Sequence, residues 1–177
     1  MTHTKKKALA IVLLALVVVS MLLIVVFLPE VVSVGWHVLH GSSTKFLVWE
    51  VPIPWGWREL KADKLLVIQK VGRWNSPPCD AIVTTLDLPL GSDVDIEQLK
   101  KGRLETELKN GRQLISESEV HLDGEVSVCL TFRGDEQSDL RWIDCDFPIH
   151  RLSVGYRGTK EQSRILNVII PNIRPIK

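Results

Sequence analysis

Residues 114–133 carry the stretch "LISESEVHLDGEVSVCLTFR", which decides the fold of the chain. Asp123-Gly124 is a residue pair that two-residue hairpin turns prefer, and a run of strand length lies on each side of it. In the second run, polar and apolar side chains alternate. We therefore expect an antiparallel hairpin of residues 114–122 and 125–133, with Val126, Val128, Leu130 and Phe132 facing inward and Glu125, Ser127, Thr131 and Arg133 facing outward.

Further strand and helix patterns surround this hairpin. Strands are predicted at residues 46–51, 64–71, 80–88, 140–147 and 150–157. A helix capped by Ser92 or Asp93 ends at Asn110-Gly111, and a second covers residues 160–170 behind a capping box of Thr159 and Gln162. The apolar stripe of the first helix is Ile96, Leu99, Leu104 and Leu108. Beyond an N-terminal transmembrane helix, the fold class is thus α+β, an antiparallel sheet of about six strands packed with two helices.

The chain has three cysteines, and two of them suit a disulfide. Cys129 and Cys145 are equally distant from Gln137, in the polar turn between two predicted strands. Residues placed symmetrically about a turn face each other across an antiparallel pair, so we expect Cys129 and Cys145 to be bonded. A bridge from Cys79 to either, or three reduced thiols, are the alternatives.

Residues 8–28, "ALAIVLLALVVVSMLLIVVFL", are apolar except for Ser20 and carry no charge. As a helix they would span roughly 31 Å, the thickness of the hydrocarbon core of a bilayer. Lys5, Lys6 and Lys7 precede them, which predicts a cytoplasmic N-terminus in a plasma or inner membrane. A cleaved signal peptide is the rival interpretation, although the run is long for one and lacks an A-x-A site.

The expected organisation follows from this anchor. Residues 1–7 are cytoplasmic, 8–28 cross the bilayer, 29–44 form a juxtamembrane linker and 45–177 form an extracytoplasmic domain. Pro29 is expected to end the helix, Gly41 to Thr44 to form a hinge, and His37 and His40 to face solvent. Without the three N-terminal lysines, 19 basic residues stand against 21 acidic ones, a balance of −2 that argues against nucleic-acid binding.

Candidate catalytic and binding residues are few. Asp144 and Asp146 share one strand face and could form an acid/base pair with His121 or His150, but solvated acids on a strand face are the commoner case. Tryptophan is abundant, and an exposed set including Trp55 and Trp74 would suggest an interaction or carbohydrate-binding surface. The alternative is that Trp57 fills the core and the others are partly buried. No motif points to a cofactor or a metal.

The order of elements resembles that of the PsbP-like fold, which the extrinsic photosystem protein PsbP shares with a Ran-binding nuclear-import factor and bacterial DcrB-type lipoproteins. The similar features are a Pro-x-Gly-Trp turn at 54–57, an acidic-capped central helix, a Leu-Asp-Gly turn at 122–124, and Gly158 before an amphipathic helix at 161–170. The resemblance covers about residues 45–174. It implies a non-enzymatic module that binds or stabilises protein assemblies, although the lipoproteins carry a lipid-bearing cysteine instead of a transmembrane anchor.

The expected function is therefore a single-pass cell-envelope protein whose outer domain binds an envelope protein partner without catalysis. Its other partner is the lipid bilayer, through residues 8–28. The alternatives are a small anchored hydrolase that uses His121 or His150 with Asp144 or Asp146, and a tryptophan-based carbohydrate-binding module.

Overall fold

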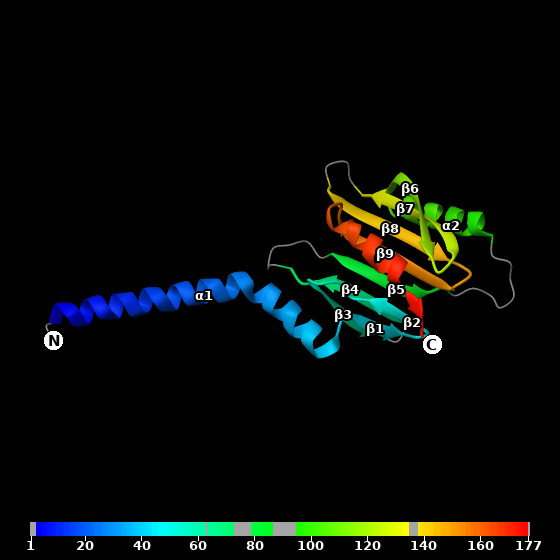
Figure 1. Cartoon of the computed structure of the whole chain (residues 1–177). Helices are drawn as coiled ribbons and strands as arrows, with labels where there is room; N and C mark the ends of the chain where they lie inside the picture. Colours follow the sequence, from blue (N-terminus) through cyan, green and yellow to red (C-terminus); the bar gives the residue numbers. More distant parts are fainter. Residues whose placement is uncertain (1–2, 63, 73–78, 87–94, 135–137, 177) are drawn as a thin grey trace.

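The computed structural model describes residues 3–62, 64–72, 79–86, 95–134 and 138–176. A long N-terminal helix leads into a domain of two sheets and several short helices (Figure 1). The helices are α1 (His3–His40), α2 (Ile96–Lys109) and α3 (Leu166–Ile169), with 3-10 turns at Gln162–Ile165 and Ile170–Asn172. The strands are β1 (Ser43–Phe46), β2 (Trp49–Pro52), β3 (Trp57–Ala62), β4 (Leu65–Lys70), β5 (Asp80–Thr85), β6 (Gln113–Leu122), β7 (Glu125–Arg133), β8 (Leu140–Phe147), β9 (Leu152–Thr159) and β10 (Arg174–Pro175).

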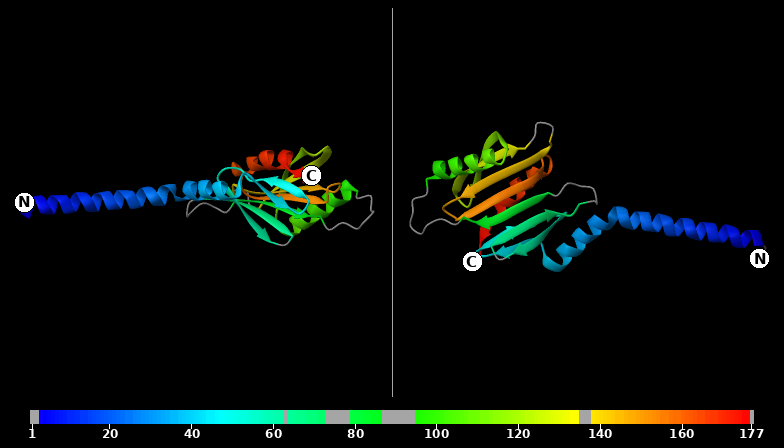
Figure 2. Two further views of the ribbon diagram at one scale, coloured as in Figure 1. Left: turned by 60° about the horizontal axis from the view of Figure 1, so that its bottom comes forward. Right: turned by 180° about the vertical axis from the view of Figure 1, so that it is seen from behind.

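The main sheet has seven antiparallel strands in the order β3-β4-β5-β9-β8-β7-β6. A second sheet, in the order β1-β2-β10, lies with α3 on one face of it, and α2 lies on the other (Figures 1 and 2). The core lies between the main sheet and the layer of the small sheet and α3. The α+β class and the antiparallel sheet are as predicted, whereas the strands are more numerous than the six expected.

The central hairpin forms as β6 and β7, with Leu122 opposite Glu125 across the turn. Leu130 and Phe132 are buried as expected, but Val126 is exposed, and Glu125 and Ser127 are buried. The inward and outward assignment is wrong at this end because the buried face of β7 is the one that holds Glu125, Ser127 and Cys129. Glu125, for example, accepts hydrogen bonds from the backbone N–H groups of Ile149 and His150.

The predicted strand at 46–51 is instead a hairpin, β1 and β2, in which Phe46 pairs with Trp49. Leu47 turns the chain with φ of 55°, a conformation that apolar side chains rarely adopt and that no pattern of turn residues announces. Strand β3 is also absent from the strands predicted from the sequence. It is an edge strand whose charged side chains, such as Glu59 and Lys61, hide its strand character.

Helix α1 continues through Pro29 to His40, where the sequence predicted a helix end and a linker. The helix bends along its length (Figure 1), as is usual where a proline removes a backbone donor inside a helix. Gly41, with φ of 82°, then ends it, and Ser43 and Thr44 belong to β1 and not to a hinge. The segment is helical because it packs on the domain, as described below.

Helix α2 begins at Ile96, and the carboxylate of Asp95 accepts a hydrogen bond from the backbone N–H of Glu97 at 2.9 Å. The predicted caps Ser92 and Asp93 lie outside the described residues. The predicted apolar stripe is only partly right, since Leu108 is 52% exposed whereas Glu107 is buried. Polar contacts with the sheet, and not the leucines alone, set the rotation of this helix.

Candidate functional site

The end of α1 is joined to the domain by two buried polar side chains. The hydroxyl of Ser33 accepts a hydrogen bond from the backbone N–H of Gly56 at 2.8 Å. The ring nitrogens of His37 lie 3.0 Å from the carbonyl oxygen of Gly41 and 3.1 Å from that of Pro54. We call the contact of α1 with the turn at residues 54–56 the helix–turn junction. The expectation that His37 faces solvent is wrong, because His37 is 6% exposed.

Aromatic rings surround the helix–turn junction. The ring of His37 lies 4.3 Å from that of Trp55 and 5.0 Å from that of Trp36, which also stacks on His40. An open pocket of about 320 Å³ adjoins them, and Glu30, Lys70 and Trp55 line it. Indole rings that are part exposed and part packed are typical of the membrane–water interface. Trp55 is exposed, and Trp74 lies outside the described residues.

The other tryptophans do not form an exposed set in the part of the chain that the structure describes. Trp49 and Trp57 are buried in the core. Trp142 is half-buried, and the guanidinium of Arg112 lies 4.4 Å from the centre of its ring. Trp49, Trp57 and Trp142 therefore contribute no exposed aromatic platform in the described part of the chain.

Cys129 and Cys145 lie opposite each other on β7 and β8 and form a disulfide. This is the pair that the symmetry of the hairpin predicts. Cys79 lies outside the bridge and is buried beside Tyr156, whose hydroxyl donates a hydrogen bond to the carbonyl oxygen of Thr159 at 2.7 Å. Burial, and the neighbouring Cys79, raise the pKa of the Tyr156 phenol.

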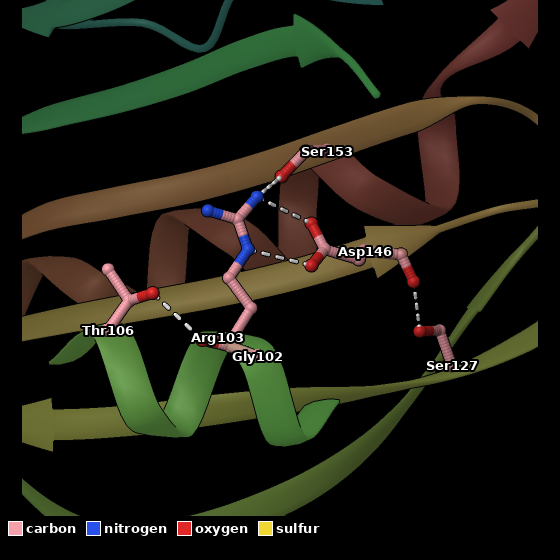
Figure 3. A network of polar contacts seen from close by, with 6 residues as sticks. All are labelled: Gly102, Arg103, Thr106, Ser127, Asp146 and Ser153. Atoms are coloured by element: carbon pink, nitrogen blue, oxygen red, sulfur yellow. Dashed lines mark hydrogen bonds and ion pairs between the residues drawn. The ribbon is translucent and has the colours of Figure 1, made fainter. Parts of the chain in front are cut away.

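Asp146 is held by a basic side chain that reaches down from α2. Arg103 donates to both carboxylate oxygens of Asp146, at 2.9 and 3.1 Å, and to the hydroxyl of Ser153 at 3.3 Å (Figure 3). On the other side, Ser127 donates to the backbone oxygen of Asp146. The view that Asp144 and Asp146 are solvated surface acids is therefore wrong. The bidentate pair instead fixes α2 on the sheet.

Asp144 lies under the same helix, but the bidentate hydrogen bonds of Arg103 go to Asp146. Burial raises its pKa from 3.8 to about 6, an effect that the positive charge of Arg103 only partly offsets. Glu107 and Asp146 add to the rise, and Arg112, which forms an ion pair with Glu107, opposes it. A proton-carrying carboxyl at near-neutral pH could act as a general acid, but only if a substrate could reach it.

The structure does not bring the predicted catalytic residues together. His121 is exposed on the edge strand β6. His150 turns its Nε2 atom to the carbonyl oxygen of Leu122, at 3.0 Å, and packs its ring on Trp49 in the layer opposite α2. No hydrogen bond or ion pair joins either histidine to Asp144 or Asp146 in the described part of the chain. The cavity beside the two aspartates is only about 20 Å³, room for little more than a water molecule.

The helix–turn junction and the Arg103–Asp146 pair were both missed by reasoning from sequence. A signal for the second exists, since Asp144 and Asp146 alternate with the apolar residues Ile143, Cys145 and Phe147. Two acids on one face of a buried strand need a basic partner, and Arg103 lies in the helix expected to cover that face. For Ser33 and His37 no comparable signal is present, because nothing in the sequence pairs them with the turn at 54–56.

No protein-family model matches the chain, and no curated protein matches it. Among solved structures, it is similar to cyanobacterial PsbP (CyanoP) from Synechocystis sp. PCC 6803, with a TM-score of 0.50 and 12% identity over 75% of this chain and 91% of that one. The fold is PsbP-like. A protein of unknown function from Pseudomonas aeruginosa, PA94, matches with a TM-score of 0.44 and 13% identity over 71% of this chain and 88% of that one. At such identities the PsbP-like domain inherits an architecture and no ligand or partner.

Proposed function

We propose that this protein is a single-pass membrane protein whose PsbP-like domain lies outside the membrane and binds another envelope protein without catalysis. One observation carries the proposal. The window Ile11–Leu28 of α1 has a mean hydropathy of 3.5 and none of it is buried, yet the same helix ends in contact with the domain. The apolar window of α1 is suited to the interior of a bilayer, and the C-terminal part of the same helix contacts the domain.

The contacts of Ser33 and His37 fit a retained anchor, because the helix runs without a break from the apolar window to the domain. Removal of the apolar segment together with the following turns of the helix would leave the Gly56 N–H and the Pro54 carbonyl without these partners. It would also uncover Trp57 and its neighbours on the side where α1 contacts β3. Lys5, Lys6 and Lys7 before the span support a cytoplasmic N-terminus in the plasma or inner membrane.

The disulfide supports the location of the domain. Disulfides persist in oxidising compartments and are rare in the cytoplasm, so the Cys129–Cys145 bridge fits a domain on the far side of the membrane. The arrangement of polar groups supports binding over catalysis. The buried polar clusters tie elements together, as Arg103 and Asp146 do, and none of the predicted histidine–aspartate pairs forms at a cavity that could hold a substrate.

Topology is tested on the full chain in its own membrane. The protein should resist extraction by alkaline carbonate, keep the mass of the uncleaved chain, and show one reactive thiol when it is denatured without reduction. Three thiols would contradict an oxidising location. A shorter mass with release into the soluble fraction would show that the apolar segment is a signal peptide.

Binding is tested by proximity labelling from a ligase fused to the C-terminus. The matched control carries residues 1–44 of this chain in front of an unrelated domain, so that the anchor is the same. Envelope proteins labelled by the complete chain but not by the control support the proposal. Identical sets of labelled proteins would mean that the PsbP-like domain selects no partner.

A further inference from the structure

The C-terminal part of α1 turns an apolar face away from the domain. Val31, Val34 and Val38 are 64%, 49% and 75% exposed, and we call them the valine stripe. At about 100° per residue, these three side chains lie within about 60° of one another on the helix. The side chains buried against the domain are instead the polar Ser33 and His37. This is the reverse of an ordinary surface helix, which buries its apolar face and turns its polar face to water.

The valine stripe continues the surface of the apolar span. Helix α1 runs unbroken from His3 to His40, and Val31 lies only about 4.5 Å beyond Leu28 along the helix axis. The interfacial layer on each side of the hydrocarbon core of a bilayer is roughly 5–7 Å thick. The bend of α1 turns the part after the span away from the axis of the span, which keeps it closer to this layer than a straight helix would (Figure 1). A helix with one apolar face at this depth is typical of interfacial segments.

The open pocket at the helix–turn junction adjoins the valine stripe, because Val34 belongs to both. We call it the junction pocket. Its volume of about 320 Å³ is within the range of ligand sites, roughly 300–1,000 Å³. Glu30 and Ser33, which also line it, lie only about 3 and 7.5 Å beyond Leu28 along the helix axis. The junction pocket is therefore at the depth of lipid headgroups if the span crosses a bilayer.

The junction pocket is held together from both sides. The hydroxyl of Ser33 accepts a hydrogen bond from the Gly56 N–H, which joins α1 to the turn. The carbonyl oxygen of Gly56 accepts a hydrogen bond from the Val71 N–H at 2.8 Å, which brings the end of β4 beside the same turn. The position of Lys70 relative to α1 is thus set by the backbone of the turn.

Two side chains of opposite charge line the junction pocket, Glu30 from α1 and Lys70 from β4. No ion pair joins them to each other in the described part of the chain. A ligand that carries a phosphate and an ammonium group can engage both, because the phosphate accepts hydrogen bonds from Lys70 and the ammonium donates to Glu30. Trp55, which is 66% exposed, adds to the lining an indole of the kind that lies at headgroup level.

From the valine stripe, the two opposite charges and the depth of the pocket together, we propose that the junction pocket binds the headgroup of a phosphatidylethanolamine-type lipid. The lipid comes from the leaflet on the domain's side of the membrane, and its acyl chains lie along Val31, Val34 and Val38. A choline headgroup fits less well, since it has no N–H group to donate to Glu30. The proposal rests on the proposed membrane anchor and adds a lipid that fixes the domain against the membrane surface.

The first test is native mass spectrometry of the full chain released from nanodiscs that contain equal amounts of phosphatidylethanolamine, phosphatidylcholine and phosphatidylglycerol. The chain should retain one phosphatidylethanolamine in clear preference to the other two lipids. Equal retention of all three, or no retained lipid, would overturn the proposal. Preference for phosphatidylglycerol would also overturn it, because Lys70 would then act without Glu30.

Two substitutions separate the roles of the charges. Lys70→Gln removes the partner of the phosphate and should lower retention of phosphatidylethanolamine roughly tenfold, as loss of a hydrogen bond to a charged group does. Glu30→Gln removes the partner of the amine, so the preference for ethanolamine over choline should disappear. Lys64→Gln is the matched control, because Lys64 is an exposed lysine beyond the other end of β4. Thermal unfolding identifies any variant that misfolds. A control as deficient as Lys70→Gln would show that the pocket does not select the lipid.

A photo-cross-linking amino acid in place of Val38 tests the valine stripe in isolated membranes, and the same group in place of Val168, an exposed valine of α3, is the control. A lipid adduct at position 38 and none at 168 supports the proposal. An adduct at 38 with a protein, with a second copy of the chain, or with nothing would overturn the lipid as its occupant. Equal lipid adducts at both positions would mean that the domain lies on the membrane by another face, which also overturns it.

The outcome for the anchor is distinguishable from the outcome for the pocket. A chain that stays in the membrane at its full mass but retains no phosphatidylethanolamine overturns this proposal alone. A chain from which the apolar segment has been removed overturns the anchor and this proposal together.

Discussion

The two ends of the domain reverse the backbone in opposite ways. Where α1 joins the domain, Gly41 and Gly56 take positive φ at 82° and 83°, where glycine is unstrained, and buried polar side chains close the contact. At the far end, Leu47 and Arg151 take positive φ without that freedom, and the apolar side chains of Leu47 and Val48 remain in solvent. The near end is therefore closed by contacts within the chain, whereas the far end leaves apolar surface in water.

The largest effect is expected from removal of the Cys129–Cys145 disulfide, which stabilises the domain as a whole. Replacing Cys129 and Cys145 with alanine should lower the free energy of unfolding by about 3 kcal/mol, as expected for a loop closed by a disulfide over 16 residues. Urea unfolding under non-reducing conditions measures the loss. Because the bridge joins β7 and β8 of the same sheet that contains β3, hydrogen exchange should rise at the helix–turn junction and at the β1–β2 turn together. A loss confined to one end would mean that the ends are not one cooperative unit.

The second test weakens only the helix–turn junction. His37→Ala removes a buried ring that contacts two carbonyl oxygens, and the free energy of unfolding should fall by about 2 kcal/mol. His40→Ala is the control, since His40 is exposed and its ring nitrogen contacts the Trp36 carbonyl within α1 itself. Spin labels on α1 and on β3 report whether the helix loosens from the domain. Equal effects of the two substitutions would contradict a specific role for His37.

The middle of the sheet gives a pH-dependent prediction. The pKa of Asp144 is about 6 in the folded chain against 3.8 as its ordinary value, so the folded state holds this proton more tightly. Its contribution to stability is therefore complete below pH 4 and is lost as pH rises to about 6, by at most ~3 kcal/mol.

Asp144→Asn should consequently raise the stability by about 1 kcal/mol at pH 7.5 and have little effect at pH 4, and Asp146→Asn, which breaks the pair with Arg103, should destabilise at pH 7.5. Urea unfolding at both pH values measures the difference. A stability profile of Asp144→Asn that runs parallel to that of the parent chain would contradict the raised pKa.

The smallest effects compare the turns directly. Gly56→Ala forces a side chain into positive φ at the near end and should destabilise by about 1 kcal/mol, although the space around it is open. Leu47→Gly relieves the same strain at the far end and should stabilise by up to about 1 kcal/mol. Thermal unfolding measures both. If Leu47→Gly destabilises, the leucine side chain contributes more to the fold than its strained conformation costs.

Local rules were enough for the elements whose residues carry their own signals. Asp123-Gly124 predicted the β6–β7 hairpin, the symmetry about Gln137 predicted the Cys129–Cys145 pairing, and the order of elements predicted a PsbP-like fold. The first two predictions succeed because the information lies within one turn and its two strands.

The failures occur where distant residues decide. Pro29 predicts the end of a helix, but Ser33 and His37 gain partners from residues 54–56, and the helix continues. Leu108 is predicted on the buried face of α2, but it is exposed and Glu107 is buried instead, paired with Arg112, while Arg103 reaches Asp146 from the same helix. The turn at Leu47 contains no residue typical of turns. Its conformation follows from the pairing of Phe46 with Trp49, which leaves two residues to reverse the chain. Such choices cannot be made from spacing alone.

The helix–turn junction has a mechanical consequence. A helix that ends in a flexible linker lets a domain point in any direction, but α1 is fastened to the domain by the contacts of Ser33 and His37 with the turn at residues 54–56. Each residue of an α-helix turns the chain by 100° and advances it by 1.5 Å. One residue inserted between the span and Ser33 would therefore rotate the whole domain about the helix axis by more than a quarter turn. The number of residues between the apolar span and Ser33 therefore determines which way the far end of the domain faces about the helix axis.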